Sequence, residues 1–471
     1  MRIFILLSFF LSYNITWATG FENCKDAKLF LELNSSQCAI VKSPLTYQDN
    51  SEESIELFVR KFPSLKTKRG SIWLIAGGPG ESGASFYKII DRYRSAFPNL
   101  DIFIPDHRGT GASSAICPEE SSGSVGGKNL VGEEWGTCFS YMYSNTSYVK
   151  AFSISNAAKD LRLLINNMSG TGKRYIYGVS YGTQLALRLA HLENVNLDGI
   201  ILDSLVPMQN DSNFDLSKRS QIANMVGHEL INKCKRSNQC SGKSSDELKI
   251  QLSVLIEKTK SIKDFSTNLP EISLTNFFGA LLDIPSIRNE IPNIIISLSK
   301  GDVTDLIDAV EATRSYYEKF NPGYENFGSS IPLVQVITAS ENNLRSKITK
   351  VDLAKETKNF LFTSPLPNLM AENRMPTYDH DIFYSKLPVN LPKTLILHGT
   401  LDSKTHYDAA KNHATKLAKA DKLKFVNIID APHFIALNAP SCFKTYVDIF
   451  IDGGFIKKLN CQDKNVLVEF E

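Results

Sequence analysis

The run Gly-Val-Ser-Tyr-Gly at positions 178–182 constrains the fold more than any other feature, because of what lies on either side of it. Residues 174–177, which precede it, are mostly aromatic or β-branched and indicate a strand. Residues 183–187, which follow it, indicate the start of a helix. A serine between two glycines in such a setting lies on a tight turn that exposes its side chain, and the helix N-terminus beyond it favours negative charge. We therefore predict that Ser180 is a nucleophile.

Strand-like segments recur on both sides of this turn. They are short, mostly apolar and bounded by Gly, Pro or Asp, as buried parallel strands are. Amphipathic stretches such as residues 154–167 lie between them. This alternation predicts an α/β protein with a mostly parallel, doubly wound sheet. The strand-like segments are residues 71–76, 101–105, 175–179, 199–203, 394–398 and 425–429.

The alternation of strands and helices stops after Pro207. From Met208 to Tyr384 the pattern is largely helical and interrupted by prolines, and strand-like segments resume only at Thr394. We predict a large helical insertion that covers one end of the sheet as a lid; an independent second domain is the alternative. The predicted boundaries are residues 1–20 for a signal peptide, 21–207 and 385–471 for the two parts of the core, and 208–384 for the lid.

A nucleophilic serine needs a general base, and the base needs an acid to orient it. After a turn of this kind the chain order is serine, acid, histidine. His433 follows the last strand-like segment and is the predicted base. Asp402, which follows residues 394–397, is the predicted acid because its loop neighbours the histidine loop in the expected sheet. Asp203, at the end of the strand after the Ser180 helix, is the alternative.

The oxyanion formed during acyl transfer needs two hydrogen-bond donors. One is expected from the backbone N–H of Tyr181, the residue after the nucleophile, and the other from the loop after an early strand. The Gly-rich loop at residues 77–80 lies there, and we assign the N–H of Gly78, with Gly77 as the alternative. Pro79 has no N–H to donate. A phosphate-binding loop is excluded because no lysine follows these glycines.

The N-terminus predicts export. A short positive start precedes an apolar run at residues 3–11, and Ala18 and Gly20 supply the small residues of a signal peptidase site. The run is shorter than the roughly 20 residues needed to span a bilayer, so we expect no stable membrane insertion. An uncleaved anchor is the alternative. We expect delivery outside the cell or to a lysosome-like compartment.

The 8 cysteines all lie beyond the predicted cleavage site and form four couples close in sequence. An even number in an exported chain favours disulfides. The expected pairs are Cys24–Cys38, Cys117–Cys138, Cys234–Cys240 and Cys442–Cys461, although sequence alone cannot prove connectivity. Four Asn-x-Ser/Thr motifs predict glycosylation at Asn34, Asn145, Asn167 and Asn210.

The charge balance and the cysteine spacing argue against several other classes of protein. Lys plus Arg is 52 against 50 for Asp plus Glu, so the net charge of +2 favours no polyanionic partner. We find no basic stripe with interleaved aromatics and expect no nucleic-acid binding. No pair or cluster of cysteine and histidine has zinc spacing, so we predict no metal site and no cofactor.

Three motifs together resemble the prolyl aminopeptidase and tripeptidyl aminopeptidase family of α/β-hydrolases. They are Gly-Gly-Pro-Gly at residues 77–80, Asp-His-Arg-Gly-Thr-Gly at 106–111 and Gly-Val-Ser-Tyr-Gly-Thr at 178–183. The region from Thr394 to Cys461 looks like the tripeptidyl branch, and Ala76 departs from the histidine usual in the prolyl branch. The resemblance implies an α/β-hydrolase fold and a serine-type aminopeptidase whose substrates are peptides with a free N-terminus.

Such an aminopeptidase needs an acidic group in the lid to bind the substrate ammonium. The sequence does not choose among the candidates Glu271, Asp283, Glu290 and Glu325. A carboxylesterase or lipase with the same catalytic residues is the alternative enzyme, and a non-catalytic binding protein on the same fold is the alternative class. An epoxide hydrolase or dehalogenase is disfavoured because it needs an aspartate where this chain has Ser180.

Overall fold

The computed structural model describes residues 20–48, 52–121, 123–127, 129–234, 239–259, 273–417 and 422–470. The predicted signal peptide lies outside the described residues, except for Gly20, and so does Glu271.

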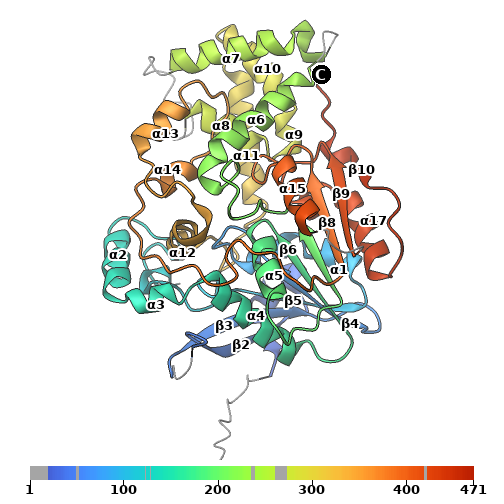
Figure 1. The fold of residues 1–471 in the computed structure, drawn as a ribbon. Coiled ribbons are helices and arrows are strands. Elements are labelled where there is room, and N and C mark those ends of the chain that lie inside the picture. Colours follow the sequence, from blue (N-terminus) through green and yellow to red (C-terminus); the bar gives the residue numbers. More distant parts are fainter. Residues whose placement is uncertain are drawn as a thin grey trace, which may run out of the picture.

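A ten-stranded sheet, in the order β1-β2-β3-β5-β4-β6-β7-β8-β9-β10, lies in the lower half of the molecule as drawn in Figure 1. The pairs from β1 to β5 in this order are antiparallel, and every pair from β5 to β10 is parallel. The strands are β1 (Glu22–Asn23), β2 (Gln37–Pro44), β3 (Ser54–Phe62), β4 (Gly70–Ile75), β5 (Leu100–Pro105), β6 (Lys173–Val179), β7 (Gly199–Asp203), β8 (Thr394–Gly399), β9 (Leu423–Ile429) and β10 (Asn460–Gln462). The predicted mostly parallel α/β sheet is confirmed.

Strands β4 to β9 correspond to the six segments expected from the sequence, whereas β1, β2, β3 and β10 were not predicted. The difference follows from burial. Every residue of β4, β5, β7 and β8 is buried, and these strands are mostly apolar runs. Strand β2 alternates buried and exposed residues and contains Lys and Ser, which makes a weaker sequence signal.

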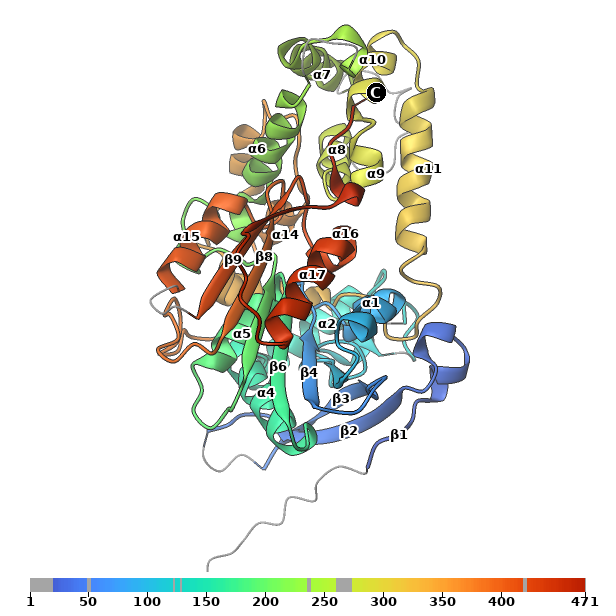
Figure 2. The ribbon, with the colours of Figure 1, turned by 90° about the vertical axis from the view of Figure 1, so that its right-hand side faces the viewer.

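Helices cover both faces of the sheet, as expected for a doubly wound fold (Figure 2). Helices α4 (Ile154–Met168), α5 (Tyr181–Ala190) and α15 (Tyr407–Leu417) pack on one face, and α1 (Ile90–Ala96) and α17 (Pro440–Ile451) on the other. Successive side chains of a strand point to opposite faces. Accordingly Trp73 and Ile75 of β4 pack in the apolar core on the side of α4, α5 and α15. Ile72 and Leu74 pack in the core on the side of α1 and α17.

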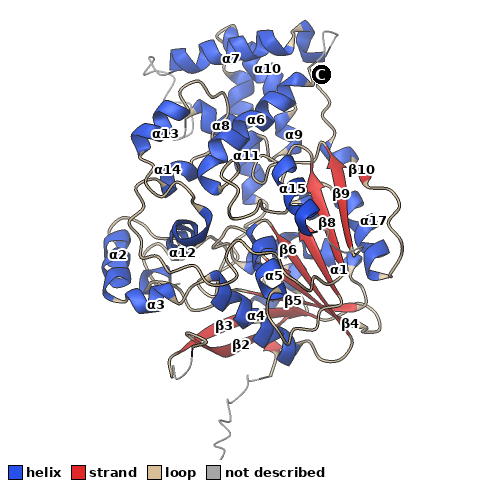
Figure 3. Cartoon of the chain, in the orientation of Figure 1, coloured by secondary structure: helices blue, strands red, loops and turns tan. Residues whose placement is uncertain are grey.

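The segment between β7 and β8 is mostly helical and has its own apolar core. Figure 3 shows most of its helices, in blue, stacked beyond one end of the red sheet. Leu401, in the loop after β8, and Phe470, near the C-terminus, join this core and tie it to the sheet domain. The α-helices described between β7 and β8 are α6 (Arg219–Asn232), α7 (Ser245–Thr259), α8 (Leu274–Leu281), α9 (Pro285–Arg288), α10 (Ile291–Ser299), α11 (Thr304–Glu318), α12 (Ile331–Ile337), α13 (Lys350–Glu356) and α14 (Leu366–Met370).

The remaining α-helices of the described residues are α2 (Glu134–Ser144), α3 (Thr146–Lys150) and α16 (Ile435–Asn438).

The structure pairs the cysteines in the four couples expected from their spacing, with Cα–Cα separations of 5.0, 5.4, 5.9 and 6.0 Å. Side chains of all four predicted glycosylation sites are exposed. Within the described ranges, no helix is long and apolar enough to cross a membrane.

Candidate active site

Ser180 lies in the turn between β6 and α5 with φ 56° and ψ −125°. A positive φ is unusual for a residue with a side chain, so the backbone is strained at this point. The flanking glycines are required by space. A Cβ on Gly178 would lie 2.3 Å from the carbonyl oxygen of Gly182, and a Cβ on Gly182 would lie 2.4 Å from that of Ile75. The local sequence therefore forms the strand, turn and helix that the motif predicts.

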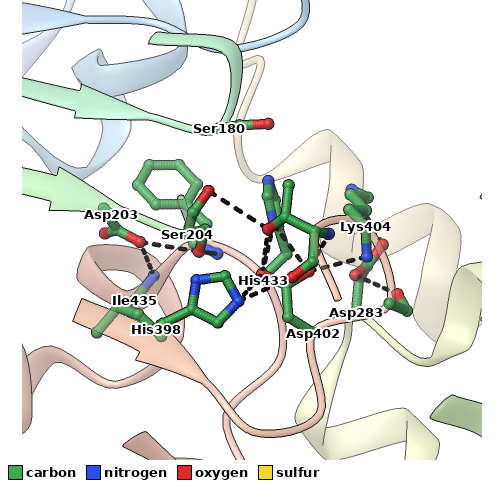
Figure 4. A network of polar contacts seen from close by, with 12 residues as sticks. Ser180, Asp203, Ser204, Asp283, His398, Asp402, Lys404, His433 and Ile435 are labelled. Atoms are coloured by element: carbon green, nitrogen blue, oxygen red, sulfur yellow. Dashed lines mark hydrogen bonds and ion pairs between the residues drawn. The ribbon is translucent and has the colours of Figure 1, made fainter. Parts of the chain in front are cut away.

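His433 and Asp402 lie next to each other in the loops after β9 and β8 (Figure 4). His433 Nδ1 is 2.8 Å from Asp402 Oδ2 and 3.0 Å from Oδ1. The carboxylate is fully buried and also accepts hydrogen bonds from the N–H groups of Lys404 and Thr405 and from the Thr405 hydroxyl. Because its Nδ1 faces Asp402, His433 is left with Nε2 as the nitrogen available for a substrate or nucleophile.

The environment of Asp402 keeps it ionised. Burial by itself would raise the pKa of this carboxyl, but the charge of His433 and the hydrogen bond to it hold the pKa well below its usual range. His398 Nε2 lies 3.8 Å from Asp402 Oδ2, the oxygen that His433 Nδ1 also approaches. Burial lowers the pKa of His398 to about 4, so this second histidine is neutral at ordinary pH.

Asp203, the alternative acid, does not contact His433. Its carboxylate accepts hydrogen bonds from Tyr177 Oη at 2.7 Å and from the N–H groups of Ile435 and Ala436 at 2.8 and 2.9 Å. Burial raises its pKa even though these hydrogen bonds oppose the shift. Asp203 therefore holds the N-terminus of α16, the short helix that begins two residues after His433.

Ser180 and His433 line one cavity of about 430 Å³. The structure records no hydrogen bond between their side chains within the described ranges, and no dashed line joins them in Figure 4. The core supplies residues such as Gly78, Glu81 and Lys404, and the segment between β7 and β8 supplies the rest of the wall. The residues from that segment are Arg219, Asp283, Tyr316, Tyr317, Phe320, Phe327 and Leu366.

A second, smaller hollow of about 30 Å³ meets the first at Ser180. Gly78 and Tyr181, the expected oxyanion donors, both line it. Neither backbone N–H has a hydrogen-bond partner in the part of the chain that the structure describes. Gly78 has φ +105°, and a Cβ there would lie 2.7 Å from the nitrogen of Gly80. Two free N–H groups beside Ser180 are the arrangement that an oxyanion requires.

The acidic residues considered for binding the substrate ammonium differ in whether they line the cavity. Of those described, only Asp283 lines the cavity; Glu290 and Glu325 are exposed elsewhere. Asp283 is already paired with Lys404 Nζ at 2.9 Å and bonded to Ser403. Glu81, which sequence reasoning missed, also lines the cavity. Its position directly after the Gly-rich loop at residues 77–80 was the signal that could have found it.

The electrostatic setting of Glu81 differs from that of Asp283. Burial raises the pKa of Glu81, while the charges of Lys404 and His433 lower it in part. No ion pair involves Glu81 among the residues that the structure describes. The cavity therefore contains one carboxylate that is paired with a cation, Asp283, and one without an ion-pair partner in the described ranges, Glu81. In the same ranges, no cluster of three or more His, Cys, Asp or Glu side chains is placed to hold a metal ion.

A comparison with a family profile supports the fold. The profile of the alpha/beta hydrolase fold family matches residues 71–238. Solved structures that resemble the chain include a thermophilic esterase from Thermogutta terrifontis, with 15% identity, coverage of 88% of this chain and 98% of that one, and a TM-score of 0.38. An epoxide hydrolase from Vigna radiata has 13% identity, coverage of 85% and 95%, and a TM-score of 0.38. No curated protein matches.

The sheet order, the turn at Ser180 and the family profile agree on one architecture. The protein has an α/β-hydrolase fold with a mostly parallel sheet and a large helical segment between β7 and β8. The solved structures are too distant to indicate a substrate.

Proposed function

We propose that this protein is a serine hydrolase that forms an acyl-enzyme on Ser180 and acts on peptides with a free N-terminus. One observation carries the hydrolase part. The strained turn presents Ser180 to the same cavity as His433, whose Nδ1 lies 2.8 Å from a buried Asp402. A nucleophile, a base and an orienting acid are the parts that serine-based acyl transfer needs.

In the proposed reaction Ser180 Oγ attacks the scissile carbonyl carbon while His433 Nε2 accepts the hydroxyl proton. Asp402 holds the ring through Nδ1 and stabilises the imidazolium that forms. The N–H groups of Tyr181 and Gly78 bind the oxyanion. The protonated His433 then donates its proton to the leaving amine, and a water molecule activated by the same nitrogen releases the acyl group.

The preference for peptides rests on the resemblance to aminopeptidases, and two features of the cavity support it. The volume of about 430 Å³ is in the range of small-molecule sites and suits a short peptide better than a folded protein. Glu81 supplies a carboxylate without an ion-pair partner in the described ranges, so we propose Glu81, rather than a lid residue, as the group that binds the substrate ammonium.

An esterase or lipase is the second candidate, because the same reaction cleaves esters. The aromatic and aliphatic part of the cavity wall, which includes Phe320, Phe327 and Leu437, favours it.

We further propose that the protein is secreted or delivered to a lysosome-like compartment and carries glycans; its four disulfides support an oxidising location.

The reaction class is tested with a fluorophosphonate probe. The wild-type protein should be labelled, and Ser180→Ala should be folded but unlabelled. Labelling of Ser180→Ala at the wild-type rate would overturn the assignment.

The substrate class is tested by comparing turnover of tripeptidyl and aminoacyl anilides, the same compounds with blocked N-termini, and short acyl esters. Faster cleavage of the unblocked anilides supports an aminopeptidase. Equal cleavage of blocked anilides contradicts a free N-terminus requirement, and activity on esters alone favours the esterase.

A further inference from the structure

Arg219 occupies a special position relative to the two hollows of the active site. Among the described residues, three line both the larger cavity and the smaller hollow: Gly78, Ser180 and Arg219. The first two belong to the proposed reaction centre. Arg219, the first residue of α6, therefore borders the place where the scissile bond of a substrate would lie.

In the described part of the chain the guanidinium of Arg219 makes no hydrogen bond or ion pair, and its Nε is buried without a partner, although the residue as a whole is half-buried. Lys404, the other lysine or arginine that lines the two hollows, is neutralised by Asp283 at 2.9 Å. Burial lowers the pKa of Arg219, although the charges of Asp402 and Asp283 oppose the shift.

This arrangement is costly for the folded protein. A guanidinium stays charged in proteins, and removing part of it from water without a partner, as at the half-buried Arg219, is unfavourable. The position adds to the cost, because the first turn of a helix carries partial positive charge and favours anions over cations. An anion bound to Arg219 would offset both effects by neutralising the guanidinium.

We propose that Arg219 binds a carboxylate of the substrate next to the scissile bond and so determines specificity; this inference rests on the proposed hydrolase function. A carboxylate accepts two parallel hydrogen bonds from the planar guanidinium and cancels its charge. A neutral peptide carbonyl would leave the charge of the half-buried guanidinium uncompensated. The preferred substrates are short peptides that present either a C-terminal carboxylate or an acidic side chain close to the cleaved bond.

The test uses tetrapeptides with a free N-terminus. At each position Glu is compared with Gln, and the C-terminal acid is compared with the amide, so that the two sources of the carboxylate are separated. For at least one pair, the wild-type kcat/KM for the acid should exceed that for the neutral partner by about ten- to a hundredfold, as expected for a hydrogen bond to a charged group. In Arg219→Gln this ratio should fall to about one.

Two further variants control for charge and for geometry. Arg219→Lys keeps the charge without the planar fork, so its ratio should be intermediate. Lys218→Gln removes a positive charge one residue away that lines neither hollow, and its ratio should equal that of wild type. Calorimetric titration of Ser180→Ala with the same peptide pairs gives the preference as an affinity, independent of cleavage.

The outcomes separate the two proposals. If fluorophosphonate does not label the wild-type protein, the hydrolase proposal fails. If the protein is labelled but both the wild type and Ser180→Ala treat each acid and its neutral partner alike, the role of Arg219 is overturned and the hydrolase stands. A preference that survives in Arg219→Gln also overturns it.

Discussion

The carboxylate of Asp203 accepts a hydrogen bond from the backbone N–H of Ile435 at 2.8 Å, although the two residues are 232 positions apart. Asp203 ends β7, and Ile435 begins α16 two residues after His433. The hydroxyl of Ser204, the next residue, accepts a hydrogen bond from the N–H of Phe434. The end of β7 therefore holds the loop that carries His433, and Asp203 is a positioning residue rather than the partner of the histidine.

We expect Asp203→Asn to destabilise the protein and to lower kcat. The amide has one acceptor oxygen where the carboxylate has two, so a buried donor among Tyr177 Oη and the two N–H groups loses its partner. Such a loss costs about 1–3 kcal/mol. Urea unfolding and kcat are the measurements. The control is Asp198→Asn, whose exposed carboxylate also accepts a backbone N–H, from Arg174 at 2.8 Å. Equal effects of the two substitutions would contradict a special role for Asp203.

Asp402→Asn should reduce kcat by about three to four orders of magnitude. The amide can offer its N–H₂ group to His433 Nδ1 and stabilise the tautomer whose Nε2 carries a proton, which cannot accept one from Ser180. Steady-state kinetics on the best substrate is the measurement, with intact folding shown by circular dichroism. A variant with more than a tenth of the wild-type kcat would exclude Asp402 as the orienting acid and reopen the search for another carboxylate.

The stability of the protein should depend on Asp402 through pH. The pKa of Asp402 in the folded protein is below its ordinary value of 3.8, so the unfolded chain binds a proton more readily than the folded protein. The contribution of the ionised carboxylate to stability is therefore fully present above that value and is lost as the pH falls below it. Urea unfolding between pH 6 and pH 3 should show the difference between wild type and Asp402→Asn changing only in the acidic part of this range. A constant difference would contradict the lowered pKa.

Gly182→Ala should destabilise the fold by about 1–3 kcal/mol, because the new Cβ would lie 2.4 Å from the carbonyl oxygen of Ile75 and force the turn at Ser180 away from β4. Fluorophosphonate labelling should slow as well. Gly136→Ala in α2 is the matched control, since a Cβ there meets nothing within 4 Å. That substitution should stabilise the helix by about 0.5–1 kcal/mol. A Gly182→Ala variant as stable as wild type would contradict the close approach of Gly182 to the backbone of Ile75.

Removing the Cys442–Cys461 disulfide, which joins α17 to β10, should lower stability by about 3 kcal/mol in the chain-entropy description. Removing Cys234–Cys240 should cost about 2 kcal/mol, because its sequence separation is 6 rather than 19. Paired serine substitutions and urea unfolding test both values. A larger loss from the shorter loop would show that native contacts, not loop closure, dominate.

Features that depend on neighbouring residues could be predicted from the sequence alone. The turn at Ser180 follows from two glycines between a strand and a helix, because only glycine leaves room for the carbonyls of Gly182 and Ile75. Four of the six central strands, β4, β5, β7 and β8, follow from short, mostly apolar runs that are buried on both faces. The cysteine couples are close in the chain, and they are the pairs that the structure contains.

Features that depend on packing between distant segments were decided only by the tertiary structure. Asp203 and Asp402 both end or follow a central strand and both fit the chain order, and only the arrangement of β7, β8 and β9 decides which one meets His433. The sequence offered lid acids for the ammonium, whereas the fold brings Glu81 to the cavity wall and neutralises Asp283 with Lys404. No sequence motif pointed to Arg219 as a residue of the site. Whether a charge is paired depends on which side chains surround it in space, and a chain can bring those side chains from any distance along its sequence.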